Sequence, residues 1–203
     1  MAKSDREYRA LSCVVLRALE DRPEGDLTVH GYATTFEDPY VLWTDPDGTK
    51  CVEIVDRHAL DAADMSDVIM QYDHAGKVLA RRSNDTLRLT IDEHGLKIDA
   101  DLSKSQAARA LYEEIDNRLV TRMSWAFVVD EDSVDHDREG RTYTRRILRV
   151  KKIYDVSAVS LPADPNTYIA ARSALDGAIE AERRRDLERQ RLRMKLKIGG
   201  TER

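Results

Sequence analysis

The sequence predicts a mixed β fold, a barrel or sandwich of many short strands with one or two helices interleaved. Short runs of β-branched and apolar residues recur through the first 160 residues, and turn-rich breaks such as EDRPEGD at 20–26 separate them. Only one or two stretches carry a helical period, so strands and helices do not alternate as in a βαβ series. A chain of 203 residues, 41% of them hydrophobic and 35% charged, is long enough to bury a core of ordinary size.

The first half of the chain is expected to consist mainly of strands. Runs such as LSCVVLRAL and LTVHGYATTF are rich in the β-branched and aromatic residues that favour strands. The expected extended segments are residues 11–19, 27–36, 68–72, 78–79 and 87–91. Residues 37–50 contain two prolines and a glycine and are expected to be mostly loop, whereas residues 52–65 start as a strand and then turn helical.

A hairpin and a helix are expected in the middle of the chain. DEHG at 92–95 predicts a hairpin turn between LRLTI and LKIDADL, because glycine supplies the positive φ that such turns demand. Ser103 is the expected helix N-cap, with Gln106 completing a capping box three residues later. The apolar residues that follow at spacings of three, four and four share one helix face: Ala108, Leu111, Ile115 and Leu119.

Residues 118–165 are the stretch around which the predicted fold is organised. They consist of two strands joined by a polar excursion, and the second strand, residues 142–161, is stopped by Pro162 and Pro165, since proline cannot donate to a ladder. Alternation along the first strand separates a bulky row, expected to face the core, from a leaner row. The bulky row is Leu119, Thr121, Met123, Trp125, Phe127 and Val129, and the leaner row is Arg122, Ser124, Ala126 and Val128.

Composition argues against several classes of protein. The formal net charge of −5 gives no overall footprint for nucleic acid, and no apolar run approaches the ~18 residues of a membrane span. Cys13 and Cys51 are far apart and form no CxxC, which argues against a disulfide framework and a zinc ribbon and fits a reducing cytoplasm. The N-terminus, MAKSDREYRA, lacks the apolar region of a secretory signal.

The character of the chain changes from Arg172 onward. Residues 173–203 hold nine Lys or Arg against six Asp or Glu, with a thin stripe of Leu and Ile among them. This pattern predicts a charged helix whose mixed charges make a solvated or partner-binding face. We therefore expect one main domain, residues 1–172, and a charged helical C-terminal tail, residues 173–203.

Ser124, His74 and Asp155 are candidate catalytic residues, because a serine, a histidine and a carboxylate on strands of one domain are the minimum set for nucleophilic acyl transfer. Ser124 lies on the leaner row beside Ala126, where a substrate chain could approach. The strand pattern alone favours a serine that merely faces solvent.

The other two candidates are argued from their neighbours. His74 ends a short apolar run and precedes Ala75-Gly76, so it is placed to reach a neighbouring strand, and histidine suits a general base at neutral pH. Asp155 interrupts the apolar IYDVSAV, and a buried carboxylate costs several kcal/mol unless a group such as an imidazole N–H partners it. A surface histidine in a loop and an edge-strand aspartate facing water remain the alternatives.

Chain order and motifs leave the class of chemistry open. The order His, Ser, Asp matches none of the three familiar triad orders, and the absence of a G-x-S-x-G elbow argues against an α/β-hydrolase. A metal hydrolase using Asp73, His74 and a third ligand such as His58 is an alternative, but no H-E-x-x-H or comparable spacing supports it.

Several segments together resemble a known family. They are YDH at 72–74, RMSWAF at 122–127 and YDVSAVSLPADPNTYI at 154–169, with GYATTFEDP at 31–39 and the DEHGLKIDADL hairpin also fitting. The chain resembles, over roughly residues 8–172, the prohead (procapsid) maturation proteases of tailed bacteriophages, the HK97-like group. The segment at 154–169 is the most specific of these.

The resemblance implies a fold and a site. The fold is a herpesvirus-protease-like β-barrel with interleaved helices, to which the charged C-terminal helix is added. Ser124 would be the nucleophile, His74 the general base, and Asp155 the acidic third member, a position where many relatives have Glu. Related viral enzymes use a second histidine there, for which His136 in its predicted turn is a poor candidate. No cofactor or metal is implied.

The resemblance also implies a function, a serine endopeptidase of capsid maturation that works through an acyl-enzyme. Its substrates would be scaffolding segments of the major capsid protein, other procapsid proteins and the protease itself. It would act as a homo-oligomer inside the assembling procapsid in the host cytoplasm, with no membrane and no specific nucleic acid. No motif names the oxyanion donors, and the arginine cluster before the Asp155 strand makes Arg145, Arg146 or Arg149 the conjectured donor. The alternative is a non-catalytic capsid assembly or scaffolding module that retains the fold.

Overall fold

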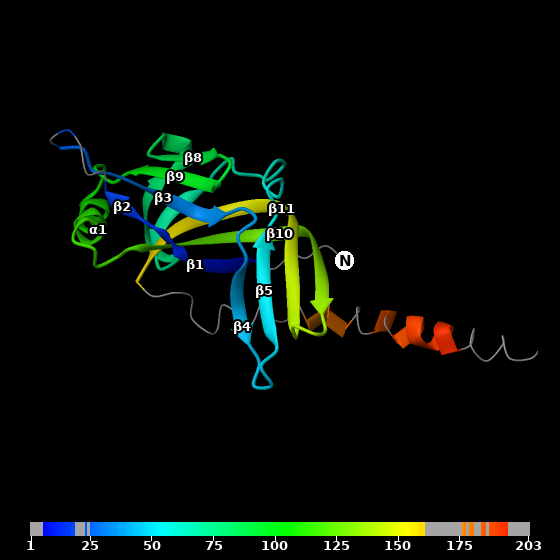
Figure 1. Ribbon diagram of the computed structural model, residues 1–203. Coiled ribbons are helices and arrows are strands. Elements are labelled where there is room, and N and C mark those ends of the chain that lie inside the picture. The colour runs from blue at the N-terminus through cyan, green and yellow to red at the C-terminus, as the bar shows by residue number, and fades with distance from the viewer. Residues whose placement is uncertain are drawn as a thin grey trace, which may run out of the picture.

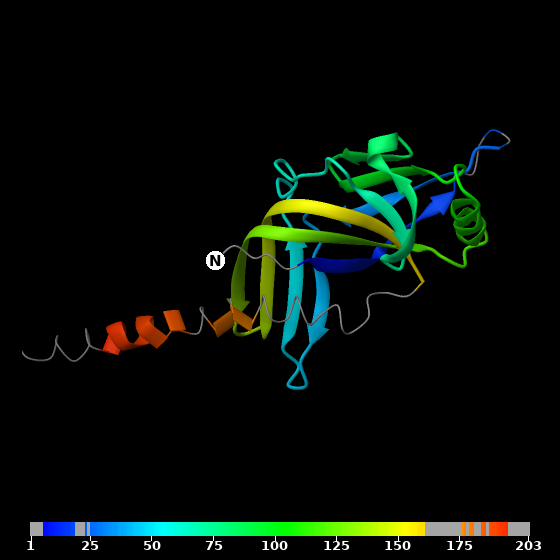
Figure 2. The same ribbon diagram turned by 180° about the vertical axis from the view of Figure 1, so that it is seen from behind.

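Two β-sheets make up most of the structure (Figures 1 and 2). The computed structural model describes residues 6–18, 23, 25–160, 176–177, 179–180, 184–185 and 187–194, and within residues 11–15 it describes the backbone alone. The larger sheet contains β1 (Glu7–Val15), β10 (Arg122–Asp137), β11 (Thr142–Val159), β5 (Lys50–Val55) and β4 (Tyr40–Thr44) in that order, with β6 (Ile69–Tyr72) and β7 (Ala75–Arg81) joined through β11. The smaller sheet contains β2 (Arg17–Ala18), β3 (Thr28–Thr35), β9 (Gly95–Asp101) and β8 (Leu87–Ile91) in that order.

The hairpin of β10 and β11 is the framework of the larger sheet. Its strands are 16 and 18 residues long, and several register shifts interrupt their antiparallel ladder. Such bulges bend a strand, and Figures 1 and 2 show both strands curving across the molecule. Two parallel strands share the free edge of β11: β5 pairs with residues 142–147 and β6 with residues 155–158. The hairpin therefore carries β4 and β5 at one end and β6 and β7 at the other.

The core lies against the inner face of β10, and the alternation predicted this face correctly from Met123 onward. Leu119 and Thr121, which the prediction placed in the same row, precede the strand and are not buried. Met123, Trp125, Phe127 and Val129 are all buried, and the Trp125 and Phe127 rings stack with centroids 3.8 Å apart. The leaner row is buried as well, since Ser124, Ala126 and Val128 are each less than 5% exposed. This part of β10 is therefore covered on both faces.

Helix α1 (Gln106–Asp116) packs Ala108, Leu111 and Ile115 into the core, whereas Leu119, beyond its end, is exposed. The expected N-cap at Ser103 is wrong. Ser105 caps the helix instead, because its side chain accepts a hydrogen bond from the backbone N–H of Ala108.

Two local predictions in the first half of the chain are also wrong. Residues 37–50 are not mostly loop, because β4 forms there and pairs with β5, and the prolines flank the strand. Residues 56–63 are not helical, because their backbone hydrogen bonds span three residues, as in successive turns. A single helical period in a short alanine-rich segment does not separate these two outcomes.

The observed fold class is the predicted mixed, strand-dominated fold with helices. Among the described strands neither sheet closes into a barrel, because the path of the larger sheet ends at β1 and β4 and that of the smaller at β2 and β8. In the described part of the tail, residues 176–177, 179–180, 184–185 and 187–194 are helical. Pro162, Pro165 and the expected domain boundary at residue 172 lie outside the described residues. Over the residues that are described, no helix is long and apolar enough to cross a membrane.

Candidate active site

His74 lies in the turn of the β6–β7 hairpin. Tyr72 pairs with Ala75, so Asp73 and His74 are the two turn residues, and both have positive φ values, 47° and 56°. Two-residue hairpin turns of this kind favour Asn-Gly, because most side chains resist positive φ. The His74 backbone is therefore held in a conformation that costs ~1 kcal/mol or more, as is common at functional sites.

Asp73 fastens this turn to the end of β11. Its backbone N–H donates to the carbonyl of Ala158 at 2.9 Å. Its carboxylate accepts two hydrogen bonds from Ser160, one from the backbone N–H at 3.1 Å and one from the hydroxyl at 3.0 Å. These three bonds offset the cost of the turn and fix the direction in which His74 leaves it.

Ser124 and Asp155 come from the paired strands β10 and β11. Ser124 lies opposite Ser157, and Ala126 lies opposite Asp155, so Ser124 and Asp155 are diagonal neighbours on one face of the sheet. Residue 155 also starts the parallel pairing with β6, which brings the His74 turn to the same face.

The three predicted side chains meet in one hydrogen-bonded chain. His74 Nδ1 is 2.5 Å from Asp155 Oδ1, and His74 Nε2 is 2.6 Å from Ser124 Oγ. A carboxylate can only accept, so we assign the proton of the neutral ring to Nδ1, and Nε2 accepts from the Ser124 hydroxyl. This is the connectivity of a nucleophile, its base and the group that orients the base.

The site is largely shielded from solvent. Ser124 is 2% exposed and Asp155 3%, whereas the His74 side chain keeps 16% of its surface exposed. A carboxylate this deeply buried needs partners, and Asp155 Oδ1 accepts a second hydrogen bond from the Ser157 hydroxyl at 2.8 Å. The Tyr8 and His74 rings pack in a T-shaped arrangement, with centroids 4.7 Å apart.

Sequence reasoning missed the supporting residues Asp73, Ser157 and Tyr8. Ser157 follows Asp155 by two residues and so had to share its face of a strand, a signal that the period of two carries. Asp73 and Tyr8 gave no such signal, because their roles depend on pairings between distant parts of the chain.

The candidate oxyanion donors lie elsewhere. Arg145, Arg146 and Arg149 are opposite residues 131–134 of β10, seven or more residues from Ser124. Arg145 is fully buried in ion pairs with acidic residues, and the other two pair with acids near the surface. The conjecture that one of them serves the oxyanion is therefore wrong in this structure.

In the part of the chain that the structure describes, neither a second catalytic histidine nor the alternative set of metal ligands is brought together. His136 stacks on Tyr143, with centroids 3.9 Å apart, at the end of β10 far from Ser124. His58 pairs with Asp61 at 3.0 Å. Within the described part of the chain, His58, Asp73 and His74 do not gather into a group of metal ligands.

Comparison with known proteins gives a family for the chain. The model of the caudovirus prohead serine protease family matches residues 14–178, a stretch that includes Ser124, His74 and Asp155. No curated protein and no solved structure matches the chain. Because the match extends over most of the 203 residues, this chain belongs to the caudovirus prohead serine protease family.

Proposed function

We propose that this protein is a serine endopeptidase of prohead maturation, with Ser124 as nucleophile, His74 as general base and Asp155 as the group that orients the base. The observation that carries the proposal is the continuous hydrogen-bonded chain from Ser124 Oγ through both ring nitrogens of His74 to Asp155. Membership of the family supports the reaction class.

In the proposed reaction, His74 Nε2 takes the hydroxyl proton as Ser124 Oγ attacks the carbonyl carbon of a peptide bond. The imidazolium that forms is stabilised by Asp155, and it then gives its proton to the leaving amine as the carbon–nitrogen bond breaks. Water adds to the resulting ester, His74 again takes and returns a proton, and a carboxylic acid and free Ser124 are released.

The experiment is expression of the wild-type chain beside Ser124→Ala, incubated with purified capsid protein. Ser133→Ala is the matched control, because Ser133 is an exposed serine on the same strand. We expect cleavage of the capsid protein and self-cleavage by the wild type and by Ser133→Ala, and neither by Ser124→Ala. Equal cleavage by Ser124→Ala would remove the serine from the chemistry.

The proposed substrates are scaffolding segments of the capsid protein, other procapsid proteins and the protease itself. Membership of the family implies capsid-protein substrates and action in the assembling procapsid. The non-catalytic assembly module predicts no functional contact between Ser124 and His74, and the 2.6 Å separation therefore favours the enzyme.

We also propose that residues 1–172 form the protease domain, that residues 173–203 are a tail that carries the enzyme into the procapsid, and that the enzyme assembles there as a homo-oligomer. The change of composition at the tail supports the division. Deleting residues 173–203 should reduce incorporation into procapsids while peptide cleavage is retained. Unchanged incorporation would exclude a packaging role for the tail.

Finally, we propose that the two sheets correspond to a herpesvirus-protease-like barrel. In support, β1 of the larger sheet passes through one residue, Leu16, into β2 of the smaller sheet, and both sheets contribute to one core. Superposition of an experimental structure on a herpesvirus protease tests this. Failure of the strands of the two sheets to align in order would refute it.

A further inference from the structure

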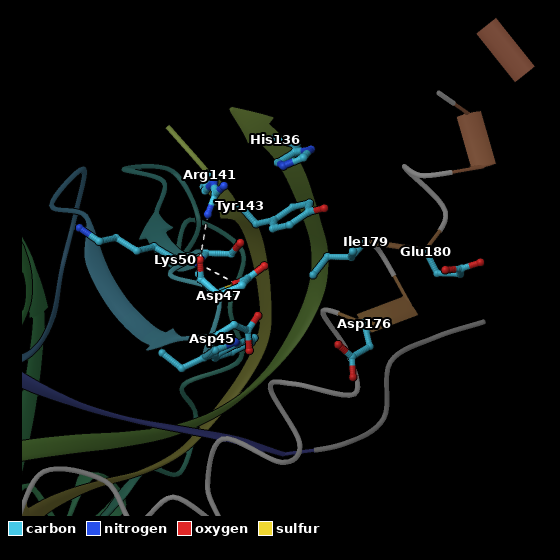
Figure 3. A pocket seen from close by; sticks show the side chains of 12 residues that line it. Asp45, Asp47, Lys50, His136, Arg141, Tyr143, Asp176, Ile179 and Glu180 are labelled. Atoms are coloured by element: carbon cyan, nitrogen blue, oxygen red, sulfur yellow. Dashed lines mark hydrogen bonds between the residues drawn. The ribbon is translucent and has the colours of Figure 1, made fainter. Parts of the chain in front are cut away.

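A groove of about 720 Å³ lies at the end of the larger sheet that is remote from Ser124. Its walls on the protein body come from the β4–β5 hairpin and the ends of β10 and β11, and a short part of the C-terminal tail lies against its open side (Figure 3). We name it the distal groove. Its protein body contributes Trp43, Cys51, His136 and Tyr143, and the tail contributes Asp176, Ile179 and Glu180.

The floor of the distal groove is a small apolar cluster separate from the main core. Cys51 and Tyr143 are its buried members, and Trp43, Val134 and Ile179 pack against them. Figure 3 shows Ile179 turned from the tail toward the side of the groove that carries Tyr143. A residue of the tail therefore completes an apolar cluster that the protein body otherwise leaves open.

The charges on the protein side of the groove balance. Asp45 and Asp47 oppose Lys50 and Arg141, and Arg141 is held by donation to the Asp47 backbone carbonyl at 3.0 Å (Figure 3). A balanced rim does not select a partner by net charge. The apolar contact of Ile179 is therefore the interaction that favours one occupant of the groove over another.

We propose that the distal groove is the docking site of this chain's own tail segment around residues 176–180, with Ile179 as its apolar anchor. The tail then leaves the protease body at the end of the sheet opposite to Ser124. This proposal does not depend on the catalytic roles given above.

Chain length allows the tail to reach the groove of its own molecule. Ser160 is bonded to Asp73 at the catalytic end of β11, and residue 176 lies at the groove. The 16 steps between them extend to at most ~58 Å. β11 covers nearly the same number of residues between Tyr143 and Ser160, and because it is curved, its ends are closer than a straight strand would place them.

Cys51 is a built-in reporter of docking. It is 3% exposed, and it is a free thiol. Burial, and then the charges of Asp45 and Glu53, raise the pKa of the Cys51 thiol to about 12, and Asp176 of the tail adds to this effect. Since the thiolate is the reactive form, a docked tail protects Cys51 both by covering it and by keeping it protonated.

The test measures alkylation of Cys51 by N-ethylmaleimide at neutral pH, followed by peptide mapping that separates Cys51 from Cys13. The full chain carries Ser124→Ala, so that self-cleavage does not remove the tail. The test variant is Ile179→Asp, and the matched control is Leu187→Asp, because Leu187 is a tail residue that is 57% exposed and does not line the groove. We expect Ile179→Asp to accelerate alkylation of Cys51 by about tenfold or more, because undocking uncovers a thiol that is otherwise 3% exposed and removes the contribution of the tail to its raised pKa. Leu187→Asp should leave the rate within about twofold.

Two outcomes would overturn the proposal. One is an Ile179→Asp chain whose Cys51 reacts at the rate of the Ser124→Ala parent while its thermal unfolding is also unchanged. The other is protection of Cys51 that is lost on dilution, which would mean that the groove binds the tail of a second copy. A thermal unfolding curve of Ile179→Asp that matches the parent, with Cys51 exposed, supports local undocking and excludes global unfolding as the cause.

Discussion

A buried cluster of charges between β1, β5 and β11 makes the stability of the fold depend on pH. Glu53 is fully buried and accepts hydrogen bonds from Arg9 at 2.6 and 2.9 Å, from Arg145 at 2.8 Å and from the Tyr40 hydroxyl at 2.5 Å. Glu7 is bonded to the same two guanidinium groups. The perturbation is Glu53→Gln, which keeps the shape of the side chain and removes its charge.

The pKa of Glu53 determines how much the carboxylate stabilises the fold and over which pH range this stabilisation is lost. Burial is the largest influence and raises the pKa, but the charges of Arg9 and Arg145 and their hydrogen bonds outweigh it, so the pKa falls from 4.5 to about 2. A depressed pKa in the folded state means that the carboxylate stabilises the fold above pH ~4.5 and that this stabilisation is lost as the pH falls toward ~2. At ~1.4 kcal/mol for each pH unit, the loss is about 3 kcal/mol.

The assay is urea unfolding of the wild type and of Glu53→Gln at pH values from 7 to 2. At neutral pH the variant should be less stable by about 3 kcal/mol or more, because two buried guanidinium groups lose a charged partner. The difference should shrink by about 3 kcal/mol between pH ~4.5 and ~2, where the wild type itself becomes neutral at this position.

The matched control is Glu139→Gln, at an exposed residue between β10 and β11. Its free energy of unfolding should equal that of the wild type at every pH. A difference between wild type and Glu53→Gln that stays constant from pH 7 to pH 2 would refute the assignment of the low pKa to Glu53.

Three further variants test the site and the fold. Asp155→Asn should lower kcat of peptide cleavage by roughly 10³- to 10⁴-fold with little change in thermal unfolding, because an amide does not hold His74 in the required tautomer. Asp73→Ala removes both hydrogen bonds to the segment after β11 and should lower kcat by about 10- to 100-fold through misplacement of His74, and an unchanged kcat would argue against this clamp. Gly95→Ala should reduce the free energy of unfolding by about 2–4 kcal/mol, measured by urea titration, because a Cβ there would lie 2.1 Å from the Thr34 carbonyl oxygen. Gly177→Ala, where a Cβ would meet nothing within 4 Å, is its control and should leave stability unchanged.

Local periodicity predicted those parts of the fold whose partners are near in the sequence. The alternation of Met123, Trp125 and Phe127 identified the core face of β10, and the DEHG segment marked the β8–β9 hairpin. The reason given for its glycine is wrong, because Gly95 does not have a positive φ; it is needed there because the Thr34 carbonyl leaves no room for a Cβ. β4 was missed because its prolines suggest a loop, although they lie beside the strand and leave its ladder intact. Pairing with β5 decided the outcome there, and pairing is not visible in a single segment.

The catalytic candidates were found by a different route. Strand pattern alone left Ser124, His74 and Asp155 open to ordinary explanations, and the resemblance to a family of proteases selected them. The supporting contacts of Asp73, Ser157 and Tyr8 were then supplied by the structure. Arg145 shows what the sequence does not reveal. The sequence shows an arginine near other arginines, and only the fold shows that acidic side chains surround it.

The meeting of the three catalytic candidates depends on the register of β6 against β11. Successive residues of a strand point to opposite faces, so a slip of one residue would carry the turn away from the face of Ser124 and Asp155. β6 has only four residues, and its ladder alone specifies register weakly. The hydrogen bonds from Asp73 to Ala158 and Ser160 fix the register of β6 against β11, because they can form only when Tyr72 lies opposite Ala158. The residue before the histidine is therefore the one that sets the histidine in place.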